Sequence, residues 1–203
     1  MGPNQYTPSQ AAAVTGLSLT AVHKALDNKI LQPKKARAGK TVRRLLAKDQ
    51  IVYLQLEAEG LRVLPLRIRR LVAAAVGASP RANTVSVGNG TALQVAVKPA
   101  RQRVDAALGR LARITRIVHS DPEILRGAPV YKGTRIPVHA VSEMMAAGAS
   151  VTEILAGYPS LTREMVELAP VYAKAFPHRG RPPLRPWATQ RPVRVSTYRL
   201  QDL

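Results

Sequence analysis

Short apolar groups in the first thirty residues alternate with cap and turn residues, which predicts two helices joined by a tight turn. Thr7 can cap the first helix, with Gln10 closing a capping box, and Gly16 ends it where a positive φ angle is needed. Ser18 can cap the second helix, and Val22 returns to the shared core. These offsets are typical of a helix-turn-helix, whose second helix enters the major groove of DNA.

Between Leu31 and Leu46, two short apolar edges flank a cationic turn, which predicts a basic β-hairpin. Such a wing neutralises phosphates beside the second helix. Its cations are Lys34, Lys35, Arg37, Lys40, Arg43 and Arg44. On the free face of the second helix, where hydroxyl, amide and ammonium groups can contact bases or phosphates, we expect Ser18, Thr20, Ala21, Lys24 and Asn28.

The middle of the chain predicts two helices separated by a hairpin. Residues 61–76 are one helical candidate, in which Pro65 marks a start or a kink. Pro99 opens another helix, with apolar residues at helical spacing behind it. Between them, Gly88-Asn89-Gly90 lies at the centre of residues 84–97 and is a strong hairpin signal.

The register of this hairpin follows from its alternating residues. A two-residue loop would place Val85 opposite Gln94 and mix apolar and polar side chains on each face. We therefore predict a three-residue loop, which pairs Val87 with Thr91 and Val85 with Leu93. The apolar face must be covered, and a symmetric dimer interface and a helix of the same chain are equally open as its cover.

The C-terminal part predicts a short, turn-rich β segment followed by three helices. The first helix is expected from Val138 to Ala147 with Gly148 ending it, and Ser150-Val151-Thr152-Glu153 is a capping box for the second. Thr162 caps the third, which either kinks or restarts at Pro170.

Arg135 lies in the turn-rich segment and has two interpretations. We expect it to form a structural bridge to a local carboxylate, Asp121 or Glu123. The alternative is a direct contact with a phosphate or with a partner protein.

The last residues, 178–203, hold four prolines and six arginines, a composition in which we expect no helix and, for the segment alone, disorder. They nevertheless include Trp187, the chain's only tryptophan, and a strand-capable run at 193–200. Such a segment suits folding on a partner or adding a strand to a partner's sheet.

Charge sharpens this picture, because 31 Lys and Arg stand against 12 Asp and Glu, a formal net charge of +19. A field of this strength favours a polyanionic partner, nucleic acid first and an acidic protein second. Residues 119–177 are the exception, with five basic and six acidic side chains. We infer that this block is a module with a partner of its own.

Several classes of protein are disfavoured. The chain has no cysteine, which removes disulfides, cysteine zinc sites and thiol nucleophiles. The longest apolar run, Leu71 to Val76, is too short for a bilayer, and the start lacks a signal-peptide pattern, so we expect a cytoplasmic protein. The four histidines are scattered without metal-ligand spacing or a catalytic triad, so we expect neither an enzyme nor a cofactor.

Two segments resemble known families. Tyr6 to Leu31 resembles the N-terminal domain of the MerR-type winged helix-turn-helix family, although His23 and Lys24 stand where that family often has aromatic or arginine residues. The string DPEILRGAPVYKGTRIPV, followed by EIL and YPSLT, resembles a small bacterial domain family of antitoxins, DUF433. With its head and tail, the whole chain is similar to VapB-type antitoxins paired with PIN-like ribonuclease toxins.

The resemblance implies an antitoxin of a type II toxin-antitoxin pair that represses its own operon by binding double-stranded operator DNA. We also expect a homodimer within a hetero-oligomer. PIN-like toxins carry carboxylates that bind Mg²⁺, and we expect the tail to cover that acidic site, with an arginine displacing or excluding the metal. The residues expected to bind the toxin are Trp187, Arg191, Arg194, Tyr198 and Arg199.

Two alternatives stay open. The chain could be a stand-alone MerR-like transcriptional regulator that has no toxin partner and senses a signal through its near-neutral block. The tail could instead be a solvated segment that binds nucleic acid.

The predicted fold is mainly α with short β-hairpins, in four parts. A winged helix-turn-helix head spans 1–60, and a helical connector with the hairpin 84–97 spans 61–116. A trihelical GTRIPV-type antitoxin domain spans 117–177, and an extended Arg/Pro-rich tail spans 178–203.

Overall fold

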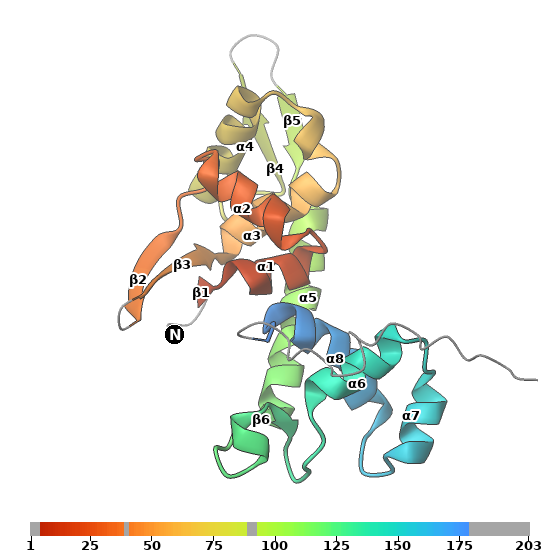
Figure 1. Ribbon diagram of the computed structural model, residues 1–203. Coiled ribbons are helices and arrows are strands. Elements are labelled where there is room, and N and C mark those ends of the chain that lie inside the picture. The colour runs from red at the N-terminus through yellow and green to blue at the C-terminus, as the bar shows by residue number, and fades with distance from the viewer. Residues whose placement is uncertain (1–4, 39–40, 89–92, 179–203) are drawn as a thin grey trace, which may run out of the picture.

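The structure is a computed structural model that describes residues 5–38, 41–88 and 93–178. It is mainly helical with small antiparallel sheets, as expected. Figure 1 shows two lobes linked by one long helix, α5 (Lys98–Ile117), which extends from the upper lobe into the lower one. Within the described ranges, no helix combines the length and the apolar character needed to cross a bilayer.

The chain begins with two short helices, α1 (Pro8–Thr15) and α2 (Leu19–Asp27). The capping box forms as predicted, since the Gln10 backbone N–H donates to Thr7 Oγ1 and the Thr7 N–H donates to Gln10 Oε1 at 2.8 Å. Gly16 ends α1 with a φ of 76°, in the left-handed region that favours glycine. The two helices and their turn are therefore confirmed.

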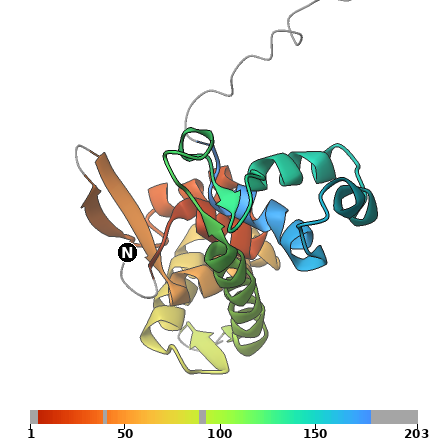
Figure 2. The same ribbon diagram turned by 90° about the horizontal axis from the view of Figure 1, so that it is seen from below.

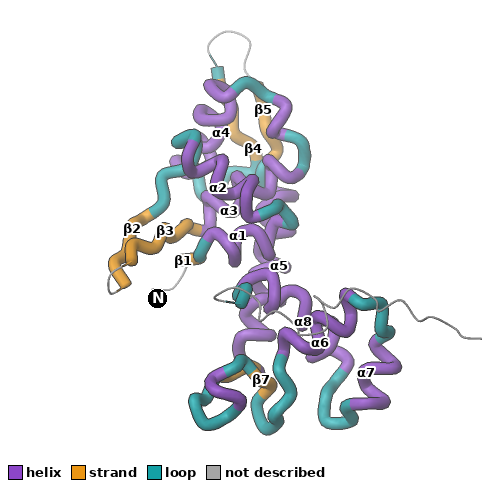
Figure 3. The backbone as a smooth tube through the Cα atoms, in the orientation of Figure 1, coloured by secondary structure: helices purple, strands orange, loops and turns teal. Residues whose placement is uncertain are grey.

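A three-stranded antiparallel sheet flanks these helices. Its strands are β1 (Gln5–Tyr6), β2 (Lys34–Ala38) and β3 (Thr41–Ala47), in the order β1-β3-β2. The predicted basic hairpin is thus present as β2 and β3, which project from the helical body (Figure 3). Its turn, with the predicted contact residue Lys40, lies outside the described residues.

The core of the upper lobe is built around α3 (Lys48–Ala58), in which four consecutive residues, Ile51 to Leu54, are fully buried. A 3-10 turn, η1 (Leu61–Val63), leads into α4 (Leu66–Ala78). Pro65 directly precedes α4, so it marks a helix start and not a kink within one helix.

The central hairpin consists of β4 (Thr84–Val87) and β5 (Leu93–Ala96), and its predicted pairing is wrong. Val85 pairs with Val95 and Val87 with Leu93, so five residues and not three lie between the strands. The predicted division of side chains between the two faces of the hairpin is still correct, because the pairing shifts by two residues and side chains alternate with a period of two.

The apolar face of this hairpin packs on its own chain. Val85 and Val87 are buried, and β4 contacts α4, whose Val72 and Val76 are fully buried. Cover by a helix of the same chain is therefore observed, whereas the predicted dimer stays a prediction. Leu93, on β5, keeps 37% of its surface exposed.

The lower lobe begins with a small β segment and ends with three helices. The β segment pairs β6 (Val118–His119) with β7 (Val130–Tyr131) around a 3-10 turn, η2 (Leu125–Gly127). The helices that follow are α6 (Val138–Ala146), α7 (Val151–Gly157) and α8 (Arg163–Ala175). The capping box of α7 and the Thr162 cap of α8 form as predicted.

The structure also bears on two predictions for this lobe, the effect of Pro170, which was left open, and the bridge of Arg135, which is wrong. Helix α8 continues through Pro170, which is exposed, so the proline neither ends nor restarts it. Arg135 is exposed and forms no ion pair with Asp121 or Glu123, and Asp121 Oδ1 instead accepts the Glu123 backbone N–H at 3.0 Å. This hydrogen bond gives the Asp121 carboxylate a partner within its own turn.

Helix α8 joins the two lobes. It contacts α6 within its own lobe, α5 along the connection, and α1 of the upper lobe (Figure 2). The buried residues of α8 include Val166, Ala169 and Tyr172. The lower lobe is therefore held against the head by packing as well as by the chain connection.

Candidate nucleic-acid interface

The exposed face of α2 carries most of the predicted contact residues. Ser18, Thr20 and Lys24 are exposed, whereas Ala21 and Asn28 are half-buried. The opposite face buries Val22, Ala25 and Leu26 against the rest of the head. The amphipathic pattern therefore places hydroxyl and ammonium groups on the outer side of the helix.

One exposed apolar residue on the outer face was missed by sequence reasoning. Leu19 is 41% exposed beside Thr20, although it is a large apolar residue. The predicted Ser18 cap, in contrast, is confirmed: Ser18 Oγ accepts the Ala21 backbone N–H at 3.1 Å, so part of its hydrogen-bonding capacity serves the helix cap.

The hairpin adds a second group of cations next to α2. Lys34, Lys35, Arg37 and Arg43 are all exposed. Lys35 lies directly opposite Arg44 in the β2-β3 pairing. Like charges opposite one another destabilise a strand pair unless a counter-charge lies beside them.

Arg44 links the hairpin to α2. Its Nη1 donates to Oδ1 of Asp27 at 2.7 Å, and both side chains are partly exposed. The acidic residue was not anticipated as part of this surface, because nothing in the local sequence indicates that residues 17 positions apart meet. An exposed pair of this kind contributes about 0–1 kcal/mol to stability.

A groove of about 440 Å³ lies between the end of α2 and the base of the hairpin. Three cations and one carboxylate line it together with apolar and amide groups. The lining residues are Leu26, Asp27, Lys29, Leu31, Gln32, Pro33, Lys35 and Arg44. Helix α2 and the hairpin therefore form one continuous, mostly cationic surface.

The end of α2 is also held from behind. Arg70, on α4, donates through Nη2 to the backbone carbonyl of Asn28 at 2.7 Å. This carbonyl lies at the C-terminal end of α2, where a cation is favourable. Asn28, which was predicted to contact DNA, is therefore also the C-cap of α2.

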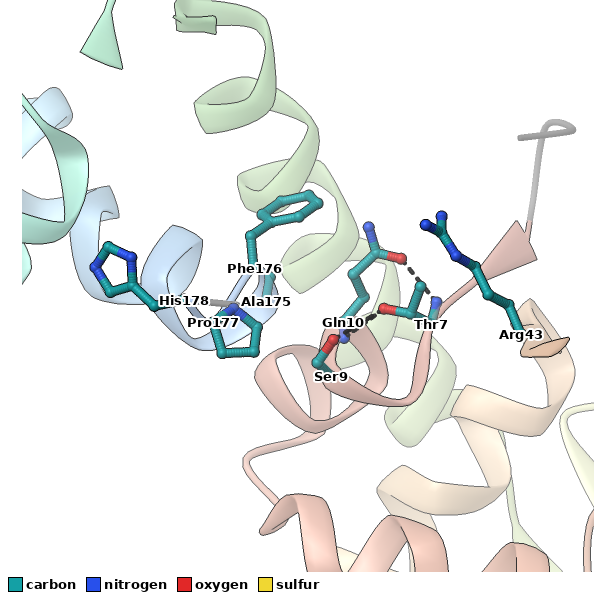
Figure 4. Close-up of a pocket in the computed structure, with 8 residues that line it drawn as sticks. All are labelled: Thr7, Ser9, Gln10, Arg43, Ala175, Phe176, Pro177 and His178. Atoms are coloured by element: carbon teal, nitrogen blue, oxygen red, sulfur yellow. Dashed lines mark hydrogen bonds between the residues drawn. The ribbon is translucent and has the colours of Figure 1, made fainter. Parts of the chain in front are cut away.

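A second cavity, of about 380 Å³, lies where the head meets the end of α8 (Figure 4). The head contributes Thr7, Ser9, Gln10 and Arg43, and the other wall is formed by residues 175–178. Arg43 therefore belongs to the hairpin surface and also to the junction of the two lobes.

The predicted toxin-binding residues Trp187, Arg191, Arg194, Tyr198 and Arg199 lie outside the described residues. Within the described ranges, no three His, Asp or Glu side chains form a group suited to a metal ion.

Residues 118–173 match the protein family described as "Protein of unknown function (DUF433)". The lower lobe therefore contains a DUF433 domain, which confirms that part of the resemblance. An uncharacterized protein, y4eO, from Sinorhizobium fredii is 44% identical over 89 residues. This match covers 44% of the present chain and 40% of that relative, so it spans less than half of either protein.

Two solved structures are also similar to the chain. A DUF433 member protein from Anabaena variabilis is 32% identical over 37% of this chain and 75% of its own, with a TM-score of 0.29. Rv2018 from Mycobacterium tuberculosis is 15% identical over 83% of this chain and 98% of its own, also with a TM-score of 0.29.

Proposed function

We propose that this chain is a DNA-binding antitoxin that represses its own operon and neutralises a PIN-like ribonuclease toxin. The observation that supports DNA binding best is the continuity of the exposed α2 face with the cationic hairpin. In this proposal the head acts as a winged helix-turn-helix, with α2 in the major groove and the hairpin against the sugar-phosphate backbone.

The chemistry of the surface suits that arrangement. Lys24 and Thr20, on the outer side of α2, offer an ammonium and a hydroxyl group to base edges. Lys34, Lys35 and Arg37 offer exposed cations to phosphates. The half-buried Ala21 leaves room for close approach of the helix to a base, such as the methyl group of thymine.

The antitoxin part of the proposal has a different basis. Residues 178–203 hold six basic side chains and one acidic side chain, and the chain's only tryptophan. Arginine pairs with carboxylates through two parallel hydrogen bonds, which suits an acidic metal-binding centre in a nuclease. The resemblance to VapB-type antitoxins points to the same partner.

Duplex titrations at several salt concentrations test DNA binding. The probe is the region upstream of the chain's own gene, measured by fluorescence anisotropy. Lys24→Ala should reduce the preference for this duplex over an unrelated one, whereas Lys34→Ala and Lys35→Ala should each lower the salt slope by about 0.9.

Lys132→Ala is the matched control, because this exposed lysine follows β7 in the lower lobe. It should leave the preference and the salt slope unchanged. If the α2 and hairpin variants behave like this control, the head does not contact DNA.

Co-expression with the adjoining gene tests the antitoxin assignment. Expression of that gene alone should arrest growth, and co-expression of this chain should restore it. A chain ending at residue 178 should fail to restore growth and to co-purify with the toxin. Survival of both properties in the truncated chain would show that the tail is not the inhibitory segment.

The stand-alone regulator is the second candidate, and a cavity in the DUF433 domain favours it. The cavity, of about 630 Å³, lies beside the end of α8. A harmless adjoining gene, combined with intact duplex binding, would support this candidate over the antitoxin.

A further inference from the structure

The cavity of the DUF433 domain lies between the segment that follows β6 and the end of α8. At about 630 Å³ it falls within the usual range for small-molecule sites. Its chemically informative lining residues are Ser120, Arg126, His139, Tyr172, Phe176 and His178.

The polar side chains that line this cavity in the described part of the chain are cationic or neutral. Among the described residues, a guanidinium, two imidazoles and two hydroxyl groups line it, and none of these lining residues is acidic. Asp and Glu side chains are nevertheless numerous elsewhere in residues 119–177. The cavity is therefore a locally anion-favouring site within a near-neutral domain.

His139 is the most constrained of these residues. It is buried, and its Nε2 lies 2.8 Å from the backbone carbonyl oxygen of Phe176. A carbonyl oxygen can only accept, so Nε2 carries the proton and Nδ1 of the neutral ring is the acceptor. Nδ1 is buried without a hydrogen-bond partner in the described part of the chain.

His178 covers the same imidazole. The two ring centroids are 3.8 Å apart and the rings are tilted by 34° to one another. Tyr172 meets His139 edge-on, with centroids 5.8 Å apart. The cavity therefore offers both the aromatic ring of Tyr172 and the nitrogen atoms of two imidazoles.

The backbone of the opposite wall is strained. Leu125 and Arg126 have φ angles of 48° and 56°, in the left-handed region that non-glycine residues rarely adopt. The turn is held by the Gly127 N–H, which donates to the Ile124 carbonyl at 3.0 Å, and by the Ala128 N–H, which donates to the Leu125 carbonyl. Backbone strain of this kind clusters at binding sites.

We propose that this cavity binds a small organic anion. Arg126 and Ser120 donate hydrogen bonds to its carboxylate or phosphoryl group, the imidazoles lie beside that group, and Tyr172 and Phe176 pack against its apolar part. Binding of the anion does not depend on the proposed function. The effect of the anion on DNA binding does rest on the proposed function, because DNA would bind to the head.

The path to the head is short. Phe176, Pro177 and His178 line this cavity and also the second cavity at the junction with the head (Figure 4). Gln10 of α1 and Arg43 of the hairpin also line the second cavity. A ligand that orders or displaces residues 176–178 therefore changes the support of the DNA-binding surface, and DNA changes ligand affinity by the same factor.

Calorimetric titration of the full chain with four probes tests the site. Benzoate and phenyl phosphate represent the two organic anions, inorganic phosphate lacks the apolar part, and benzylamine has the opposite charge. At least one organic anion should bind saturably, at least tenfold more tightly than benzylamine and inorganic phosphate. Equal affinity for phenyl phosphate and inorganic phosphate would overturn the proposal of an organic ligand and would indicate free phosphate instead.

Two arginine variants locate the binding. Arg126→Gln should weaken the organic anion at least tenfold, as expected for loss of a charged hydrogen bond. Arg135→Gln removes the same charge from an exposed residue of the same domain that does not line the cavity, and it should change nothing. Equal effects of both variants, or no saturable binding at about 10 mM, would overturn the site.

Histidine NMR gives a readout that a structural role of Arg126 would not produce. Saturation with the anion should raise the pKa of His139, since a nearby negative charge favours the imidazolium form. Loss of duplex binding with retained anion binding would reject the proposed function alone. Loss of anion binding with retained duplex binding would reject this inference alone.

Discussion

Arg69 of α4 donates two hydrogen bonds to the buried carboxylate of Glu57 on α3, from Nε at 3.1 Å and from Nη2 at 2.5 Å. Glu57 is only 2% exposed, and the hydroxyl of Tyr53 donates to the same oxygen at 2.6 Å. Burial, followed by the bond to Glu57, raises the pKa of Tyr53, so the phenol stays protonated and remains a donor. The three residues fix α4 against α3.

Removal of the cation should strongly destabilise the chain. Arg69→Met leaves a buried carboxylate without its counter-charge, and we expect a loss of about 3–5 kcal/mol in the free energy of unfolding. Tyr53→Phe should cost about 1.5–3 kcal/mol. Urea titration followed by circular dichroism measures both. Arg62→Met is the control, since Arg62 is exposed and should shift stability by less than about 0.5 kcal/mol. A similar value for Arg69→Met would contradict the structural role assigned to this pair.

Two glycine substitutions should have opposite effects. Gly16→Ala places a side chain at a φ of 76°, and we expect a loss of about 1–2 kcal/mol. Gly109→Ala lies within α5, where a new Cβ meets no atom within 4 Å, so we expect a gain of about 0.5–1 kcal/mol. Thermal unfolding of both variants is the measurement. If both variants changed stability in the same direction, the positive φ angle of Gly16 would not explain the effect of its substitution.

Asp27 is a carboxylate on a surface proposed to face phosphates. Asp27→Asn should release Arg44 and remove a repulsive charge, which raises affinity for duplex DNA about fivefold at low salt. Stability should fall by no more than about 1 kcal/mol, because the ion pair is exposed. Glu164→Gln gives the same change in net charge in the lower lobe, where Glu164 pairs with Arg113 at 3.3 Å. If both variants raise affinity equally, net charge and not location explains the effect.

His139 predicts a pH dependence of stability. Burial lowers the pKa of His139, with opposing effects from the Phe176 carbonyl and from Glu143 and a further lowering by His178. The unfolded chain, with an ordinary value of about 6.5, then takes up the proton more readily than the folded chain. The contribution of His139 to the free energy of unfolding is therefore fully present above pH ~6.5 and is lost as the pH falls through the folded-state pKa.

His139→Gln should remove this component. Unfolding free energies of both proteins, measured from neutral to mildly acidic pH, should converge as the pH falls. A constant difference between the two proteins across the range would show that His139 has the same pKa folded and unfolded.

Local sequence signals predicted much of the fold. The capping boxes at Thr7 and Ser150, the turn at Gly16 and the Thr162 cap are decided by neighbouring residues, so they could be recognised without knowledge of the whole chain. The faces of the central hairpin followed from alternation, but the loop length did not, because the pairing also depends on how β4 sits on α4.

The candidate site was less accessible to sequence reasoning. The outer residues of α2 follow from helical periodicity, whereas the meeting of Asp27 with Arg44 depends on how the hairpin folds back. The anion-favouring cavity could not be found at all, since Arg126, His139 and His178 are far apart in sequence. Pro170 was expected to disturb its helix, but its exposed position and the packing of α8 on four helices, α1, α5, α6 and α7, outweigh the missing hydrogen bond.

The uninterrupted α5 constrains how the chain can vary in length. A helix of 20 residues is a rod of about 30 Å in which each added residue turns everything beyond it by about 100°. One extra residue would swing the DUF433 domain around this axis and separate α8 from α1, whereas four extra residues would return it to within about 40° of the original angle. Natural variants of this architecture should therefore insert or delete residues in the loops far more readily than within this rod.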